Sequence, residues 1–431
     1  MVILFALLAL GVMVAANWYV WRRLFRDTTA APGWVRRAGA GLIAGGWALF
    51  VGAMVAERTD APFWLQRTLA WPGFLWLALA LYLFLAVVAG EFVRPLLRIL
   101  LDRRRPERTT ATETRRTEPE PATVGGPPAK PRPGPQPEPE SAESGGSGGS
   151  GSGQPTGPSR RLFVSRVVAG AAAAAAVGTV GYGTYGVLRG PGVKRVTVPL
   201  AKLPRAAHGF RIAVVSDIHL SPVLGRGFAQ KVVDTINSTQ PDLIAVVGDL
   251  VDGSVANLGP AAAPLAGLRA RHGAYFVTGN HEYFSGAGEW VEEVRRLGLL
   301  PLENARTELP YLDLAGVNDI AGENEGQGPD FARALGDRDR ARTCVLLAHQ
   351  PVQIDEAVEH GVDLQLSGHT HGGQLWPGNL VAAAANPTLA GLERHGDTQL
   401  YVSRGAGAWG PPTRVGAPSD ITVVQLASKR A

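Results

Sequence analysis

Cysteine and charged residues are both scarce in this chain. Its 431 residues include a single cysteine, Cys344, and charged residues make up only 18% of the total. One cysteine cannot form an internal disulfide, and it excludes a zinc site built from several thiolates. The apolar sequence around Cys344 predicts that the thiol lies in a buried strand.

Charge of either sign is unevenly distributed along the chain. Residues 1–200 contain 23 Lys and Arg against 12 Asp and Glu, whereas residues 201–431 contain 19 against 25. The net charge of +5 is therefore an average of a basic half and an acidic half. The basic residues lie in short clusters between apolar runs, and the acidic half offers no surface for a phosphate backbone. We therefore expect no nucleic acid partner.

Long apolar runs dominate residues 1–100. Residues 1–21, 40–56 and 69–90 contain no charged side chain. About 20 residues of helix, at about 1.5 Å each, cross a hydrocarbon core of about 30 Å. A cleaved signal peptide is the alternative for the first run, but no basic segment precedes it and no clear small-residue cleavage site follows it. We predict a region of three transmembrane helices within residues 1–100.

The composition changes at residues 101–160, which are rich in Pro, Glu, Gly and Ser. Such a segment cannot bury enough apolar surface to offset its chain entropy, so we predict a disordered linker. Arg160 and Arg161 then precede an Ala- and Gly-rich run, which predicts a fourth transmembrane helix at 161–189. The two arginines also resemble a twin-arginine export signal, which would make the export machinery a partner. An ordinary basic flank of a membrane span is the alternative.

Basic residues near the ends of membrane spans tend to stay on the cytoplasmic side. Five arginines follow the first apolar run and five follow the third. The loop after the second run has only Arg58 and Arg67, which Glu57 and Asp60 offset. This distribution predicts a multi-pass protein of the cell membrane, with the lipid bilayer as a partner. The fourth helix would then place the domain that follows it outside the cytoplasm.

From about residue 208 the sequence changes to short Val, Ile and Leu runs that alternate with helical segments. An amphipathic helix at 226–239 lies between apolar runs at 210–215 and 242–247. Further strands are predicted at 274–277, 311–315, 343–348, 363–366, 399–403 and 421–426. This alternation predicts an α/β domain over residues 208–427, in which ligands bind beyond the carboxyl ends of the strands.

Side chains that commonly bind metals follow five of these predicted strands. They are Asp217 and His219, Asp249, Asn280, His349, and His369 with His371. Mixed nitrogen and oxygen ligands suit Mn²⁺, Fe or Zn²⁺ better than Mg²⁺ or Ca²⁺. Two metals about 3.5–4 Å apart need a shared carboxylate, which Asp249 can supply. One such motif alone is more often structural, but five in order, each after a strand, indicate a metal site.

The series D-x-H, G-D, G-N-H-D/E, H and G-H-x-H resembles the calcineurin-like metallophosphoesterase superfamily over about residues 208–427. The motifs at 401–405 and 414–421 look closest to those of the membrane-anchored bacterial members. The resemblance implies an α/β fold with a four-layer α/β/β/α sandwich, preceded here by the helical transmembrane region. It also implies two divalent metal ions, which would be Mn²⁺, Fe²⁺/³⁺ or Zn²⁺.

The same resemblance implies a role for each motif residue. One metal would be held by Asp217, His219, Asp249 and His371. The other would be held by Asp249, Asn280, His349 and His369, with Asp249 as the bridge. His281 would be a catalytic acid or charge stabiliser beside the leaving-group oxygen, and Asp252 would orient its imidazole.

Two positions depart from the family pattern. Gly253 stands where the phosphoprotein-phosphatase branch has an arginine that binds phosphate, which disfavours a phosphoprotein phosphatase. Ala348 replaces the glycine before the fourth-motif histidine, a change of one methyl group that leaves the His349 imidazole available.

These observations favour a membrane-anchored hydrolase that cleaves phosphomonoesters or phosphodiesters by attack of a metal-bridging hydroxide. An extracytoplasmic site favours envelope, lipid-linked or nucleotide-type substrates, and the resemblance adds a UDP-diacylglucosamine-like pyrophosphate. One alternative is a non-catalytic, metal-dependent sensor or scaffold for a phosphorylated ligand, although every ligand position and His281 are intact. Another is a transporter with an ancillary domain, although its spans lack the polar groups usual in transport.

Overall fold

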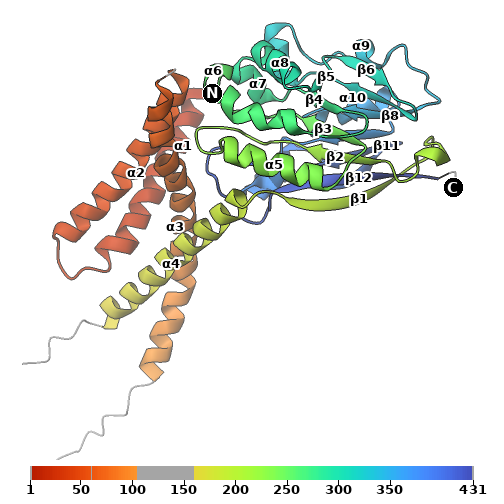
Figure 1. The fold of residues 1–431 in the computed structure, drawn as a ribbon. Coiled ribbons are helices and arrows are strands. Elements are labelled where there is room, and N and C mark those ends of the chain that lie inside the picture. The colour runs from red at the N-terminus through yellow and green to blue at the C-terminus, as the bar shows by residue number, and fades with distance from the viewer. Residues whose placement is uncertain (1, 60, 104–159, 430–431) are drawn as a thin grey trace, which may run out of the picture.

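The computed structural model describes residues 2–59, 61–103 and 160–429 of the chain. Figure 1 shows a bundle of long helices beside a domain of strands and shorter helices. Residues 101–103 and 160 of the predicted linker belong to helices, and the rest of that linker lies outside the described residues.

The bundle contains four helices, α1 (Val2–Trp21), α2 (Trp34–Arg58), α3 (Phe63–Arg103) and α4 (Arg160–Leu188). Among the described residues, α2, α4 and the Phe63–Leu100 part of α3 are long and apolar enough to cross a membrane. Leucines on the outside of α1, such as Leu4 and Leu8, are largely exposed, as expected for side chains that face lipid. The described residues of the runs predicted at 1–21, 40–56 and 69–90 are helical, as are residues 161–188 of the fourth, although α1 is not among the three helices that qualify as spans.

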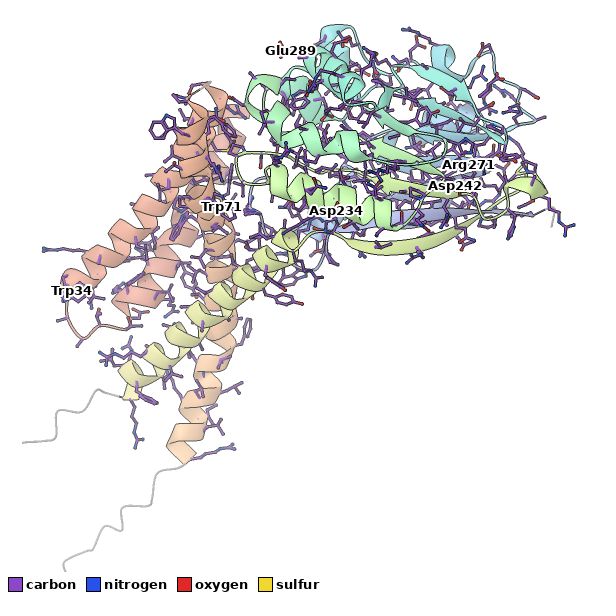
Figure 2. All side chains as sticks on the ribbon, viewed as in Figure 1. Trp34, Trp71, Asp234, Asp242, Arg271 and Glu289 are labelled. Atoms are coloured by element: carbon purple, nitrogen blue, oxygen red, sulfur yellow. The ribbon has the colours of Figure 1, made fainter. Side chains whose placement is uncertain are left out.

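Apolar packing and a few polar contacts join the four helices. One cluster contains Val20, Ala78, Tyr82, Ala176 and Val180. The basic ends of the helices lie together, because Arg166 Nε donates to Thr28 O at 3.0 Å and Arg23 pairs with Glu91 at 2.8 Å. Figure 2 shows Trp34 at the end of the bundle away from the strand domain, whereas the labelled charged residues lie on that domain.

The first sheet has six strands in the order β1-β12-β2-β3-β4-β5. Their bounds are β1 Gly192–Leu200, β2 Arg211–Val215, β3 Leu243–Val247, β4 Ala274–Val277, β5 Leu300–Pro301 and β12 Asp420–Ser428. Strands β2 to β5 are parallel, β12 is antiparallel to β2, and β1 is parallel to β12. The carboxyl ends of β2, β3 and β4 therefore meet at one edge.

The second sheet has six strands in the order β10-β11-β9-β8-β7-β6. Their bounds are β6 Ala305–Glu308, β7 Leu312–Gly316, β8 Thr343–Leu347, β9 Leu364–Ser367, β10 Gly391–His395 and β11 Thr398–Val402. Strands β7, β8, β9 and β11 are parallel, and the outer strands β6 and β10 are antiparallel to their neighbours.

Three apolar clusters show that the domain has four layers. The first lies between the sheets, where Ile212 and Val214 of β2 meet Val345 and Leu347 of β8. The second joins the outer face of the first sheet to α5 (Arg226–Ser238), α6 (Val255–Ala262) and α8 (Ala287–Arg296). The third joins the second sheet to α9 (Phe331–Leu335) and α10 (Ile354–Glu359). The predicted α/β/β/α fold is confirmed, and Cys344 is buried in β8 as expected.

The first sheet begins earlier than the domain start predicted at residue 208. Strand β1 pairs with β12 along its whole length, from Gly192↔Asp420 to Leu200↔Ser428. Only residues 189–191 separate it from α4. Val187 of α4 is fully buried in the domain core, and Leu188 O accepts a 2.6 Å hydrogen bond from Lys231 Nζ of α5. The last helix of the bundle is thus packed into the domain.

Candidate active site

The ends of five strands bring the seven predicted metal ligands to one edge of the domain. Asp217 and His219 follow β2, Asp249 follows β3, and Asn280 begins α7 (Asn280–Ser285) after β4. His349 follows β8, while His369 and His371 follow β9, with His371 in the short helix η6 (His371–Gly373). Ligand atoms of Asp217, His219 and His371 lie within 4.8 Å of one another, as do those of Asp249, His349 and His369.

Asp249 lies between these two groups. Its Oδ2 is 3.1 Å from His349 Nε2 and 3.8 Å from His219 Nε2. His219 Nε2 in turn lies 3.0 Å from His371 Nε2. Asn280 belongs beside the second group, because its Oδ1 is 3.0 Å from His369 Nδ1.

The backbone at the site adopts conformations that side chains rarely favour. Positive φ angles occur at five predicted ligands, namely Asp217, His219, Asp249, His369 and His371, with values from 47° to 71°. Such a conformation is uncommon outside glycine, and its concentration at one place is typical of a functional site. Gly248 has a φ of 72°, and a Cβ there would lie 2.6 Å from His349 Nδ1.

Glu282 binds the backbone of the loops that carry the ligands and does not belong to either ligand group. Its fully buried carboxylate accepts backbone hydrogen bonds from Asp249 (3.0 Å), Leu250 (2.7 Å) and Gly279 (2.6 Å). Burial and the charge of Asp249 raise the pKa of Glu282 to about 7. Glu282 thus fixes the turns after β3 and β4 relative to each other.

Asp252 contacts two imidazoles. Its Oδ1 lies 2.7 Å from His281 Nδ1 and 2.9 Å from His219 Nδ1. Burial opposes ionisation of Asp252, but the two histidines outweigh it and lower its pKa to about 2. Burial likewise opposes protonation of His281, but the hydrogen bond and charge of Asp252 raise its pKa to about 9. His281 is therefore a fixed, protonated imidazole that is still 14% exposed.

Burial and neighbouring charges also set the ionisation of the predicted ligands. Burial raises the pKa of Asp217, whereas the charges of His349 and His219 hold the pKa of Asp249 below its ordinary value despite burial. Burial, followed by the charge of His349, lowers the pKa of His369 to about 4. Burial and the neighbouring cations lower the pKa of His371. These shifts favour an ionised Asp249 and neutral His369 and His371, the forms that bind a cation. For His349, burial opposes protonation, but the charges of Asp249 and Asp217 raise its pKa well above the ordinary value.

The donor set fits divalent cations. His349 Nδ1 donates to Val247 O at 2.8 Å, which leaves Nε2 facing Asp249. This nitrogen is buried and faces the Asp249 carboxylate at 3.1 Å, without a well-directed hydrogen bond to any described residue. Buried polar atoms are nearly always satisfied, and a histidine held through its other nitrogen is typical of a metal ligand. Imidazole, carboxylate and carboxamide together suit Mn²⁺, Fe or Zn²⁺.

Sequence reasoning assigned no role to Arg414, Gln374 or Trp409. Arg414 is buried, donates to His371 O at 3.1 Å and lies 3.0 Å from His371 Nδ1. The Gln374 side chain donates to Trp409 O at 2.9 Å and accepts from Trp409 N at 3.0 Å. The Trp409 ring centroid is 5.5 Å from that of His281. Each contact joins loops that are distant in sequence, so only the resemblance of the motif at 414–421 singled out any of them.

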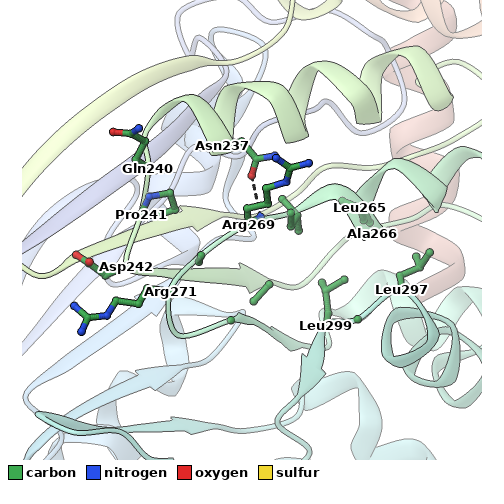
Figure 3. A pocket seen from close by; sticks show the side chains of 15 residues that line it. Asn237, Gln240, Pro241, Asp242, Leu265, Ala266, Arg269, Arg271, Leu297 and Leu299 are labelled. Carbon is green, nitrogen blue, oxygen red and sulfur yellow. Dashed lines mark hydrogen bonds between the residues drawn. The ribbon is translucent and has the colours of Figure 1, made fainter.

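A separate hollow lies at the opposite ends of the strands. Figure 3 shows it near Asp242, Arg271 and Leu299, which lie shortly before the starts of β3, β4 and β5. Its marked hydrogen bond joins Arg269 N to Asn237 Oδ1 at 2.9 Å. Ligands of α/β sheets bind at the carboxyl ends of the strands, and the two ligand groups lie there, so we assign the chemistry to that edge.

The comparisons with known proteins agree on one family. The calcineurin-like phosphoesterase model matches residues 210–373. The transmembrane protein with metallophosphoesterase domain of Danio rerio is 38% identical over 260 residues, which are 57% of this chain and 59% of that protein. An uncharacterized metallophosphoesterase of Helicobacter pylori is 38% identical over 250 residues, covering 57% and 67% of the two chains. The uncharacterized metallophosphoesterase YkuE of Bacillus subtilis is 30% identical over 284 residues, 63% and 98% of the two chains.

The family model lies within the two-sheet domain, and the chain spans 59% of the length of the Danio rerio relative. The name of that relative and the three apolar helices together support association with a membrane. The ordered motifs, the two-sheet fold and these matches lead to one conclusion. This chain belongs to the calcineurin-like phosphoesterase family, and its domain is a metal-dependent phosphoester hydrolase.

Proposed function

We propose that this chain is a membrane-anchored hydrolase that cleaves phosphomonoesters or phosphodiesters with the help of two divalent metal ions. The observation that carries the proposal is the place of Asp249, 3.1 Å from His349 Nε2 and 3.8 Å from His219 Nε2. One carboxylate therefore reaches both ligand groups, as a bridging ligand must. Two bound cations would neutralise the phosphoryl oxygens and lower the pKa of water towards neutrality.

The two ligand groups divide the roles between them. Asp217, His219 and His371 would hold one metal, while Asn280, His349 and His369 would hold the other, with Asp249 shared by both. The contacts of Asp249, Asn280 and the histidines given above support this division. The metals would be Mn²⁺, Fe or Zn²⁺, since the donors mix nitrogen and oxygen.

His281 would protonate the leaving-group oxygen. Its Nδ1 is fixed by Asp252 at 2.7 Å, and its raised pKa keeps the ring protonated at neutral pH. The acid is therefore oriented and charged before the ester bond breaks. A well-placed general acid contributes about 10²–10⁴-fold to the rate.

The side of the membrane follows from the basic residues. Arg166 of α4 reaches Thr28 after α1, and Arg23 pairs with Glu91 of α3, so the basic ends of several helices share one end of the bundle. Arginine-rich ends stay in the cytoplasm, which would place the domain on the opposite, extracytoplasmic side. That location favours envelope, lipid-linked or nucleotide-type phosphoesters. Arg160 and Arg161 would serve as the basic flank of α4 or as an export signal.

Asp249→Asn in the full chain tests the metal centre. We expect loss of bound Mn²⁺ by elemental analysis, together with loss of hydrolysis of bis(p-nitrophenyl) phosphate. Asp234→Asn on the exposed side of α5 makes the same chemical change far from the ligand groups and should retain both.

Wild-type metal content and activity in Asp249→Asn would overturn the assignment. Stoichiometric metal in the wild-type chain with no hydrolysis of any mono- or diester would instead favour the sensor or scaffold.

A further inference from the structure

An exposed apolar surface lies directly beside the predicted metal ligands. Helix α11 (Gly378–Ala385) starts five residues after η6, and none of its residues is buried. Leu380 is 66% exposed, Val381 73% and Trp376 51%. Residues 364–392 contain no Asp, Glu, Lys or Arg. We call Trp376, Leu380 and Val381 the α11 surface. Large exposed apolar side chains in a segment that contains no charged residue are unusual on a surface that faces water.

The α11 surface is continuous with the membrane bundle. Tyr82 lies within the apolar part of α3, and its hydroxyl donates to Trp376 O at 2.9 Å. Leu375 and Val415 pack against the cluster of α1, α3 and α4 side chains that contains Tyr82. The segment before α11 is therefore fixed beside apolar residues of α3.

The same segment is also linked to the surroundings of His281, the proposed catalytic acid. Gln374 joins it to Trp409 through two hydrogen bonds of 2.9 and 3.0 Å. Trp409 and Phe284 are 58% and 75% exposed, and each ring centroid lies 5.5 Å from that of His281. Exposed apolar side chains thus occur both at α11 and beside His281. The predicted ligand His371 is five residues before Trp376 in the same loop.

We propose that the α11 surface is embedded in the lipid bilayer and that the site acts on amphiphilic phosphoesters taken from that bilayer. This substrate class rests on the proposed function. Leu380 and Val381 would leave water for acyl chains, as in helices that lie in the membrane interface. The phosphoryl group would reach the ligand edge while the acyl chains stay beside α11, Phe284 and Trp409. A soluble phosphoester would gain nothing from these contacts.

Site-specific labelling tests the position of α11 without using activity. The native thiol, Cys344, is buried, so an introduced cysteine is the only reactive one. We would label Val381→Cys with a polarity-sensitive fluorophore in the full chain, reconstituted in vesicles of phosphatidylcholine and phosphatidylglycerol. Leu300→Cys on β5, which is 47% exposed in the wild type, is the matched control.

Quenching by spin-labelled lipids at position 381, but not at 300, is the expected result. Quenching by aqueous iodide alone at 381 would overturn the proposal. A label that neither quencher reaches until the protein is diluted would also overturn the proposal. It would show that a second copy of the chain covers the surface.

Two matched esters test the substrate class. Phosphatidyl-p-nitrophenol in vesicles and soluble bis(p-nitrophenyl) phosphate release the same chromophore. In the variant with both Leu380→Gln and Val381→Gln, we expect hydrolysis of the lipid ester to fall roughly tenfold or more, because two apolar side chains leave the lipid phase. Hydrolysis of the soluble ester should stay unchanged in this variant, and Leu300→Gln should hydrolyse both like the wild type.

The outcomes separate the two proposals. If the double variant hydrolyses each ester at the wild-type rate, the proposed substrate class is overturned but phosphoester hydrolysis is not. Failure of the wild type to hydrolyse either ester, with metal bound, would overturn the proposed function and the substrate class with it, while the labelling result would still decide where α11 lies.

Discussion

Arg414→Lys is expected to weaken both the domain and one half of the proposed two-metal centre while keeping the positive charge. The guanidinium is buried and makes four contacts. Nε donates to Gly407 O at 2.6 Å, Nη1 donates to His371 O and Ala417 O at 3.1 Å each, and Nη2 lies 3.0 Å from His371 Nδ1. A lysine has one nitrogen in place of three, so it cannot reach all four partners.

The size of the effect follows from these contacts. Loss of at least two hydrogen bonds, at about 1–1.5 kcal/mol each, lowers the free energy of unfolding by about 2–3 kcal/mol. For a domain of this size that is a fall of about 4–12 °C in Tm. His371 also loses the group that holds its ring. Arg414 also fixes the backbone carbonyl of His371, so its loss should shift this loop and weaken binding of the metal that His371 would hold.

Two measurements on the full chain check this reasoning. Elemental analysis after dialysis against graded free Mn²⁺ should show one metal lost at concentrations where the wild type keeps two, and thermal unfolding gives the shift in Tm. Arg394→Lys is the matched control, because that guanidinium is 61% exposed and pairs with Asp397 and a nearby carbonyl. Wild-type affinity and wild-type Tm in Arg414→Lys would refute a positioning role.

Three further changes have defined outcomes. His281→Ala should lower kcat about 10²–10⁴-fold with unchanged metal content, and a normal kcat would contradict its role as an acid. Gly248→Ala should lower Tm through about 1–3 kcal/mol of strain, because its Cβ would lie 2.6 Å from His349 Nδ1. In the control Gly227→Ala, the new methyl group meets open space, so Tm should rise slightly. Burial raises the pKa of Cys344 to about 12, so a disulfide reagent at pH 8 should titrate no thiol in the native chain and one after denaturation; reaction in the native chain would show an open core.

The central strands could be predicted from the sequence, and the edge strands could not. Strands such as β3 and β8 are buried along their whole length, so they are plain apolar runs. Strand β1 carries Lys194, Arg195 and Pro199, and β10 carries Glu393 and Arg394. Charges and proline at sheet edges discourage pairing with other chains, and they also remove the apolar signal of a strand.

The membrane helices are longer than their apolar runs. Helix α2 starts at Trp34 and includes Arg36 and Arg37, while α3 continues to Arg103. Hydropathy detects the part of a helix that lipid tolerates, but hydrogen bonding within the helix continues past the first charged residue. The sequence thus locates the spans and underestimates the helices.

The ligand residues could be located because each follows a strand by two to four residues, and parallel strands bring those positions to one edge. Their supports lack such a rule. Arg414, Gln374 and Trp409 belong to loops without periodicity, and their contacts depend on how these loops meet. The α11 helix was missed for a related reason, since its alanines are apolar but too few to indicate a span.

The short connection between α4 and β1 limits how the enzyme can meet its substrate. Only three residues separate the helix from the sheet, Val187 is buried in the domain, and Lys231 binds Leu188 O. The domain therefore cannot swing on a tether, and its catalytic edge keeps a constant height above the bilayer. For the lipid substrate proposed above, encounters would then occur by diffusion in two dimensions. Turnover should follow the mole fraction of substrate in the membrane, and diluting the vesicles with buffer should leave it unchanged.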